Sequence, residues 1–236
     1  VGVADSMTDP LRYLQQNTVD TAAMLLDFGR VRCQRLVVAS SMSIYGAGGI
    51  RVREDAPVIP ASVYGLSKYD QERLCLMWGD QHKVPTTALR LFNVFGPRQA
   101  LSNPYTGVLA NFAKALLRDE APTIYEDGLQ TRDFIYVADV ADAIVAAATT
   151  DLPLSGAYNV CTGQPTTIVR AAQVLARGLG RDIAPNITGQ TRPGDIRHCT
   201  GDPTKFHEAL GWRTHWTFED GMLSYTEWLR AHVPTE

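Results

Sequence analysis

The chain has 236 residues, enough to bury a sizeable core as one large domain or as a domain with a smaller appendage. Its formal net charge is -3, with 45% hydrophobic and 20% charged residues, which is ordinary for a globular protein and provides no basic field for nucleic acid. We therefore expect no nucleic-acid partner, and an anionic ligand would need local arginines.

The four cysteines, Cys33, Cys75, Cys161 and Cys199, are far apart and form no C-x-x-C pair. This spacing favours free thiols in a reducing compartment over a disulfide framework. The five histidines are equally scattered, so the sequence predicts no metal site. No apolar run approaches the roughly 20 residues that span a bilayer, and the first ten residues lack a signal-peptide pattern. We expect a cytoplasmic protein without a membrane partner.

The predicted elements begin with a helix over TDPLRYLQQNTVDTAAMLLDFGR (8–30), with Asp9 as its N-cap and Pro10 in its first turn. RLVVAS (35–40) is then a short apolar run, typical of a strand buried on both faces. The next predicted elements are a glycine-containing loop at 46–49, a helix around 62–82, a strand at 86–92, a helix at about 106–119, a strand at 134–137, and a helix at 139–150 with Asp139 as its N-cap.

Strands that alternate with helices predict a doubly wound parallel sheet of the Rossmann-like α/β class. After about residue 155 the predicted elements become shorter and end in two helices, with no low-complexity linker. We therefore expect a larger sheet-bearing part at 1–155 and a small α/β cap at 156–236 that packs directly on it.

Polar residues follow two of the predicted strands, at the edge of a parallel sheet where ligands bind. RLVVASSMS places Ser40, Ser41 and Ser43 at one strand end, and TALRLFNVFG places Phe92 and Asn93 at another. Serines at such positions have two interpretations: they present hydroxyl groups to a ligand, or they cap a turn or a helix.

In ASVYGLSKYDQERL (61–74), Tyr64 and Lys68 stand one helical turn apart and so share a helix face. Such pairs also occur on helix surfaces without a chemical role. The chemical interpretation is that the ammonium lowers the pKa of the phenol from its ordinary value of about 10, so that the phenol can act as a base. We expect Lys68 to lower the pKa of Tyr64 in this way.

Several segments together, in chain order, resemble the extended short-chain dehydrogenase/reductases, specifically the NAD-dependent nucleotide-sugar epimerases and dehydratases. These segments are ASSMSIYG, YGLSK, LRLFNVFGPRQ, TRDFIYVADVADA and RPGD, and the resemblance covers essentially the whole chain. It implies that 1–155 belongs to the NAD-binding domain, with some pocket segments at about 95–130, and that 156–236 is mainly substrate-binding. It also implies that the Gly-rich turn for the pyrophosphate lies upstream, so we expect the chain to be truncated at its N-terminus.

The resemblance also implies roles for individual residues. Tyr64 would take the proton from a sugar hydroxyl, Ser41 would hydrogen-bond the same oxygen, and Lys68 would hold the nicotinamide ribose of NAD. Phe92 and Gln16 would contact the cofactor, whereas Asn17 is interpreted as a structural helix residue. The residues implied for the nucleotide diphosphate sugar are Ser43, then Asn93, Arg132 and Arg192 for the diphosphate or ribose, Asp195 for a ribose hydroxyl, and Val108, Thr123 and Tyr125 for the base. The alternative for Arg132 is a salt bridge with Asp133 or another carboxylate.

The reaction type is predicted from the segment that follows Ser41. Dehydratases of the family commonly carry an Asp-Glu pair where this sequence has Met42 and Ser43, and an elimination without a carboxylate lacks its general acid. The resemblance therefore favours 4-epimerisation of a dTDP-6-deoxysugar or a UDP-hexose, by oxidation to a 4-keto sugar, rotation and hydride return. The alternatives are a dehydratase or another oxidoreductase of the family, or a non-catalytic nucleotide-sugar-binding protein.

Relatives of this kind usually pair through helices, so we expect a homodimer. The helix at about 106–119 and the helix that carries Tyr64 are the candidates for the interface. The alternative is that the apolar residues of both helices belong to the core of one subunit.

Overall fold

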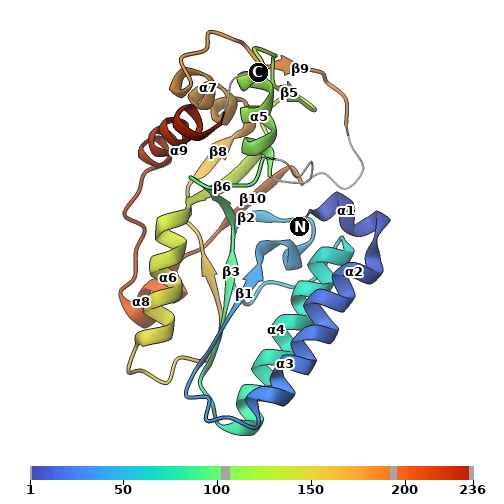
Figure 1. Ribbon diagram of the computed structural model, residues 1–236, viewed down its shortest axis with the longest axis vertical. Helices are drawn as coiled ribbons and strands as arrows, with labels where there is room; N and C mark the ends of the chain where they lie inside the picture. Colours follow the sequence, from blue (N-terminus) through green and yellow to red (C-terminus); the bar gives the residue numbers. More distant parts are fainter. Residues whose placement is uncertain (1, 102–106, 192–195, 234–236) are drawn as a thin grey trace.

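The computed structural model describes residues 2–101, 107–191 and 196–233, which form an α/β fold built on parallel sheets (Figure 1). The helices are α1 (Val3–Thr8), α2 (Pro10–Leu14), the π-helical η1 (Gln15–Val19), α3 (Asp20–Phe28), the 3-10 helix η2 (Met42–Tyr45), α4 (Val63–His82), α5 (Val108–Leu117), α6 (Val137–Thr149), α7 (Ile168–Gly178), α8 (Thr204–Leu210) and α9 (Phe218–His232). The strands are β1 (Leu36–Ser41), β2 (Gly49–Val52), β3 (Thr86–Leu91), β4 (Asn93–Phe95), β5 (Thr123–Ile124), β6 (Thr131–Tyr136), β7 (Gly156–Val160), β8 (Pro165–Thr167), β9 (Asn186–Ile187) and β10 (His198–Gly201).

The first sheet has the strand order β1-β3-β7, and its strands are parallel. Leu36 pairs with Thr86, and Leu89 pairs with Tyr158. The pair α3 and α4 covers one face of this sheet, and α6 lies on the other face (Figure 1). Strands covered on both faces read as continuous apolar runs, which is why the run 35–40 predicted a buried strand. The prediction of a parallel-sheet α/β fold is confirmed.

The predicted N-terminal helix is present as three successive pieces, α2, η1 and α3. Asp9 caps it as predicted, because its carboxylate accepts a hydrogen bond from the backbone N–H of Arg12 at 3.3 Å. The π-helical turn η1 contains Asn17, whose Nδ2 donates to Oγ of Ser67 on α4 at 3.0 Å. Asn17 therefore joins two helices, in agreement with its structural interpretation.

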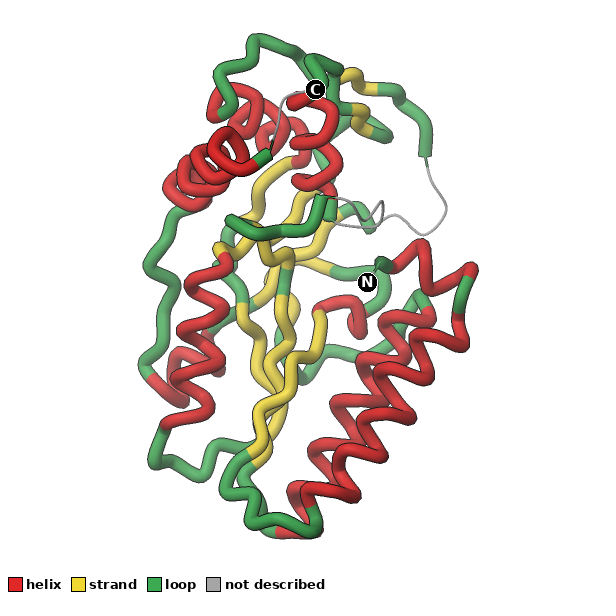
Figure 2. The backbone as a smooth tube through the Cα atoms, in the orientation of Figure 1, coloured by secondary structure: helices red, strands yellow, loops and turns green. Residues whose placement is uncertain are grey.

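A second sheet has the order β2-β10-β6-β4 with β8 antiparallel to β6, and β5 pairs with β9. Helices α5, α7 and α9 gather beside these strands at one end of the molecule (Figure 2). Apolar side chains of these helices and strands form one large core cluster, which includes Phe95, Phe112, Leu116, Phe134, Leu175, Met222 and Tyr225. The buried face of α5 is part of this cluster.

The N-cap predicted for the helix at 139–150 is wrong. Helix α6 begins at Val137 after Tyr136, and no side chain caps it. Asp139 is fully buried in the first turn, where its carboxylate accepts hydrogen bonds from the backbone N–H groups of His215 at 2.8 Å and Trp216 at 3.3 Å. The Asp139 carboxylate thus binds the segment between α8 and α9, whereas the local sequence pattern had predicted that it caps the start of α6.

All four cysteines are free thiols. Within the described ranges, no helix combines the length and the apolarity that a membrane-spanning segment requires. The same part of the chain contains no group of three His, Cys, Asp or Glu side chains arranged to hold a metal ion.

Candidate active site

Strand β1 ends at Ser41, and the chain turns there directly into η2. Oγ of Ser41 accepts a hydrogen bond from the backbone N–H of Ser43 at 3.2 Å, so Ser41 is the N-cap of η2. Helix α4 begins against this turn, because a Cβ atom on Gly65 would lie 2.6 Å from the carbonyl oxygen of Ser43. The glycine after Tyr64 therefore allows α4 and η2 to approach closely.

Tyr64 lies in the first turn of α4 and makes a side-chain hydrogen bond with Ser41. Ser41 therefore has the capping role that the sequence offered, its hydroxyl also lies beside Tyr64, and its contact with a ligand stays a prediction. Burial raises the pKa of Tyr64 above its ordinary value of 10.0, and the hydrogen bond with Ser41 partly opposes this. The predicted lowering of the pKa by Lys68 is wrong for this structure, because burial dominates and Lys68 takes no part in the balance.

The ammonium group of Lys68 points along α4. It donates to Oε1 of Gln71, and Nε2 of Gln71 donates in turn to Oγ1 of Thr21 on α3 at 2.9 Å. Burial lowers the pKa of Lys68, and the nearby acidic groups Cys75 and Glu72 oppose that change. Lys68 and Tyr64 are on one helix, as predicted, but their side chains have different partners. The Lys68 ammonium donates to Gln71, whereas the Tyr64 side chain bonds with Ser41.

Two residues that sequence reasoning missed hold Tyr64 from the N-terminal helices. The backbone N–H of Tyr64 donates to Oγ of Ser6 at 3.0 Å, and the ring of Tyr13 packs edge to face on the Tyr64 ring. Both contacts join segments more than 50 residues apart along the chain, so no local sequence pattern predicts them.

The two predicted cofactor contacts outside α4 and β1 are placed differently. Phe92 is buried in a core cluster with Cys161 and Cys199, and its ring fits against Gly201, where a Cβ atom would come within 2.6 Å of the ring. Gln16 is exposed on η1. The described hydrogen bonds of Ser41 and Tyr64 do not involve Phe92 or Gln16. The contacts of Phe92 and Gln16 with a cofactor stay predictions.

Asn93 and Arg132 stand on neighbouring parallel strands, β4 and β6. Nδ2 of Asn93 donates to the carbonyl oxygen of Asp133 at 3.2 Å, and Nη1 of Arg132 donates to that of Thr131 at 2.9 Å. The Asp133 carboxylate accepts from Oγ1 of Thr162 at 2.7 Å and from backbone N–H groups of the loop after β7. These partners, rather than an ion pair with Arg132, satisfy this buried carboxylate.

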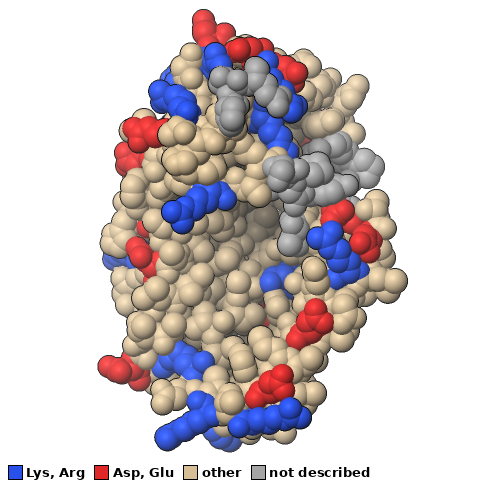
Figure 3. Space-filling view, in the orientation of Figure 1, with Lys and Arg blue, Asp and Glu red and all other residues tan. Residues whose placement is uncertain are grey.

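The remaining predicted substrate residues come from the cap. Val108 begins α5 and is half-buried against the large core cluster, and Thr123 is exposed on β5, where it pairs with Asn186 of β9. Tyr125 follows β5 and is half-buried. Arg192 and Asp195 lie outside the described residues. Figure 3 shows a hollow in the middle of the face on which the carboxyl ends of β1 and β3 lie.

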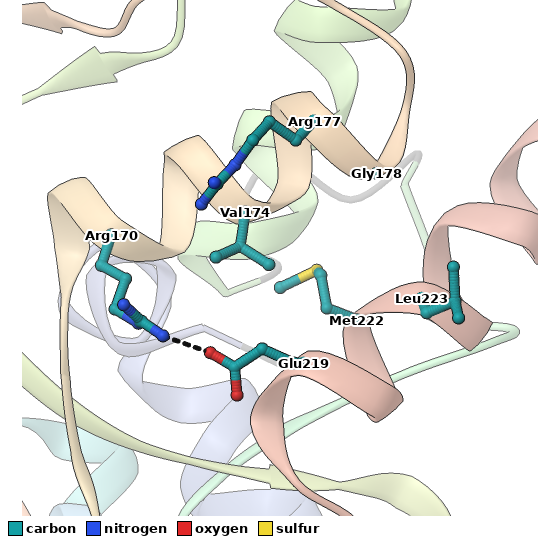
Figure 4. A pocket seen from close by; sticks show the side chains of 7 residues that line it. All are labelled: Arg170, Val174, Arg177, Gly178, Glu219, Met222 and Leu223. Atoms are coloured by element: carbon teal, nitrogen blue, oxygen red, sulfur yellow. Dashed lines mark hydrogen bonds and ion pairs between the residues drawn. The ribbon is translucent and has the colours of Figure 1, made fainter.

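A pocket of about 520 Å³ opens between α7 and α9, away from this hollow (Figure 4). Arg170 and Glu219 form an ion pair across it, and Val174, Met222 and Leu223 provide apolar lining. None of the predicted site residues that the structure describes lines this pocket, so it is separate from Ser41 and Tyr64.

Comparisons with known proteins give a consistent result. The model of the NAD dependent epimerase/dehydratase family matches residues 1–161. The dTDP-L-rhamnose 4-epimerase of Burkholderia thailandensis is 30% identical over 268 residues, covering 98% of this chain and 73% of that protein. The UDP-N-acetylglucosamine 4-epimerase of Methanobrevibacter ruminantium, solved with UDP-N-acetylmuramic acid, has a TM-score of 0.92 at 31% identity, covering 99% of this chain and 74% of that one.

The UDP-glucose 4-epimerase of Thermotoga maritima, solved with UDP-glucose, has a TM-score of 0.90 at 30% identity and covers 98% of this chain and 74% of its own. The family model spans more than half of the chain, and the fold agrees with that of the two solved 4-epimerases. The chain belongs to the NAD dependent epimerase/dehydratase family.

Proposed function

We propose that this protein is an NAD-dependent nucleotide-sugar 4-epimerase that acts on a dTDP-6-deoxysugar or a UDP-hexose. The observation that carries the proposal is the hydrogen bond between Ser41 and Tyr64 at the carboxyl end of β1, with Lys68 one turn further along α4. Ligands of open parallel sheets bind outside this end of the strands. The names of the relatives, which are 4-epimerases of dTDP-L-rhamnose, UDP-N-acetylglucosamine and UDP-glucose, support the substrate class.

The donor groups at this strand end fit NAD. Two hydroxyl groups, on Ser41 and Tyr64, and the ammonium of Lys68 are the groups that would hold the ribose at its nicotinamide end, and Phe92 and Gln16 remain proposed contacts. When bound, NAD supplies the oxidant for a carbinol carbon and later returns the hydride. Tyr64 takes the proton of the sugar hydroxyl, and Ser41 holds the same oxygen. Burial raises the pKa of Tyr64, and the contact that favours release of its proton is the hydrogen bond with Ser41.

For the nucleotide, we assign the diphosphate or ribose to Asn93, Arg132 and Arg192, a ribose hydroxyl to Asp195, and the sugar side of the pocket to Ser43. Asn93 is paired with Phe134, two residues beyond Arg132, so both polar side chains come from the same edge of the sheet. A guanidinium group suits this role because it binds phosphate oxygens in a bidentate manner. The base pocket is assigned to Val108, Thr123 and Tyr125.

Epimerisation is favoured over dehydration by the surroundings of Met42. Its sulfur accepts a hydrogen bond from the thiol of Cys199 at 3.3 Å, and it packs against an apolar cluster with Ile44 and Val52. These apolar and thiol side chains around Met42 do not supply the general acid that the expulsion of water requires. Dehydration, another oxidoreduction of the family, and nucleotide-sugar binding without turnover are the competing functions.

We also propose the division into an NAD-binding part at 1–155 and a mainly substrate-binding part at 156–236, although β7 pairs with β3 and so extends the first sheet. Of the two candidate helices for a homodimer interface, α5 buries its apolar face in the core cluster, whereas α4 exposes Leu66 at 44% and Met77 at 59%, which supports a homodimer through α4. The four free thiols support a reducing compartment such as the cytoplasm.

The test is a panel of dTDP- and UDP-sugars incubated with the full-length protein and NAD, with product stereochemistry read by NMR. A 4-epimerase interconverts two epimers and leaves the amount of NAD unchanged. Accumulation of a keto product or of NADH would support dehydration or oxidoreduction instead. Binding of the sugars without turnover would support the non-catalytic function.

A further inference from the structure

A buried ion pair and the hydrogen bonds around it join α4 to β1 and β3 beside the candidate active site. Glu72 of α4 is 1% exposed and Arg90 of β3 is 5% exposed. Nη2 of Arg90 donates to Oε1 of Glu72 at 2.7 Å, and its Nε donates to Oε2 at 3.1 Å. Oε2 also accepts a hydrogen bond from the hydroxyl group of Ser40 at 2.6 Å. The carboxylate therefore connects α4 with β3 and with the residue directly before Ser41.

The guanidinium of Arg90 extends the connection to the far end of η2. Its Nη1 donates to the hydroxyl oxygen of Tyr45 at 2.8 Å and to the carbonyl oxygen of Glu54 at 3.0 Å. The Tyr45 hydroxyl donates to Oδ1 of Asn159 on β7 at 2.7 Å. Ser40 and Tyr45 enclose the segment that contains Ser41, so the network holds this segment from both sides.

Stability alone is a poor explanation for such a pair. The desolvation of two buried charges offsets most of their attraction, and well-packed apolar residues of similar volume often serve as well. A fully satisfied polar network does, however, favour a single arrangement of the elements that it joins. Here those elements are α4, with Tyr64 and Lys68, and the end of β1, with Ser41.

We propose that Glu72 and Arg90 are positioning residues, which hold the helix that carries Tyr64 and Lys68 in register with Ser41. This inference rests on the proposed epimerase function and deepens it, because the proton of the sugar hydroxyl must pass between groups on these two elements. Burial lowers the pKa of Lys68, and the charge of the Glu72 carboxylate, after that of Cys75, opposes this change.

The first test compares Ser40→Ala and Glu72→Gln with wild type in steady-state kinetics. Ser40→Ala removes one hydrogen bond and keeps the ion pair, so it stays informative even if Glu72→Gln folds poorly. We expect kcat to fall about tenfold or more in Glu72→Gln and about threefold in Ser40→Ala, with little change in KM for the nucleotide sugar, because a small misplacement of reacting groups affects the chemical step. Glu219→Gln, which breaks an exposed Arg–Glu pair between α7 and α9, is the matched control and should keep wild-type kinetics.

The second test does not depend on turnover. In protein labelled with ¹³C at the tyrosine ζ carbons, the Tyr64 resonance is assigned by its loss in Tyr64→Phe. We expect Ser40→Ala and Glu72→Gln to shift this resonance, since both loosen the contact of Tyr64 with Ser41, and Glu219→Gln to leave it in place. If wild type epimerises no sugar, the proposed function fails and the resonance alone decides the inference. A Tyr64 resonance unmoved in both variants, or a kcat within about twofold of wild type in both, would overturn it.

Discussion

The ring of Tyr13 meets the ring of Tyr64 edge to face, with centroids 6.1 Å apart and an angle of 80° between the planes. Tyr13 is 2% exposed, and its hydroxyl donates to Oδ2 of Asp5 at 2.9 Å and accepts from the backbone N–H of Gly2 at 2.8 Å. An edge-to-face pair contributes about 0.5–1.5 kcal/mol beyond the burial of area. A separate helix, α2, thus orients the ring to which we assign the proton transfer.

Replacing Tyr13 separates the role of this ring from that of its hydroxyl. Tyr13→Phe keeps the ring contact and loses two hydrogen bonds, so we expect a loss of about 1–2 kcal/mol in the free energy of unfolding and near-normal turnover. Tyr13→Leu removes the ring and should also reduce kcat several-fold. Urea unfolding and steady-state kinetics measure the two effects. Equal turnover in the two variants would show that the ring contact does not orient Tyr64.

Tyr64→Phe should remove nearly all turnover and leave nucleotide-sugar binding largely intact, because only the group that takes the proton is lost. The matched control is Tyr69→Phe, since Tyr69 is on the same helix and packs against the apolar cluster around Ile44. Turnover by product NMR and binding by calorimetry are the measurements. Appreciable turnover in Tyr64→Phe would contradict the proton role.

The pH dependence of turnover should reflect the two causes that set the pKa of Tyr64. A base must be deprotonated, so turnover rises with pH as the phenol ionises, and a raised pKa moves this rise to higher pH. Ser41→Ala removes the hydrogen bond that lowers the pKa, so the rising limb should move further toward alkaline pH.

The control for this shift is Ser62→Ala, which removes the N-cap of α4, where Ser62 accepts from the backbone N–H of Gly65 at 3.0 Å. We expect it to cost about 1 kcal/mol of stability without moving the rising limb. A Ser41→Ala limb at the wild-type pH, in a profile of kcat against pH, would contradict the role of Ser41.

Gly65→Ala should destabilise the protein and reduce turnover. The added Cβ would lie 2.6 Å from the carbonyl oxygen of Ser43, and backbone atoms of η2 must move to relieve this contact. Overpacking of this kind costs about 1–3 kcal/mol. In the control Gly29→Ala the nearest atom is 3.4 Å away and the backbone is helical, so a gain of about 0.4–1 kcal/mol is expected. Thermal unfolding of both variants checks the difference.

Much of the fold could be predicted because its signals are local. The apolar run 35–40 became β1, and the helix with Asp9 as its cap and the helix around 62–82 are present. Asp139 was assigned wrongly because a carboxylate near a helix start has the same local pattern whether it caps that helix or binds a distant segment.

For the candidate site, the family resemblance implied that Tyr64 and Ser41 act on the same sugar oxygen, and the structure brings these two side chains together. The pKa prediction failed for a different reason. Helical spacing places Lys68 on the same face as Tyr64, but the depth of burial and the alternative acceptor Gln71 depend on how α3 and α4 pack. Neither the depth of burial of Tyr64 nor the choice of Gln71 as the acceptor for Lys68 can be predicted from the five residues YGLSK.

The sequence by itself determined the alternation of helices and strands, the strand-end serines and the family, because periodicity, capping and short motifs act over a few neighbouring residues. Only the tertiary structure decided that Tyr13 and Ser6 hold Tyr64, and that Glu72 and Arg90 join α4 to β3. These contacts depend on side-chain packing between elements far apart in the chain, and the protonation of buried groups depends on that packing in turn.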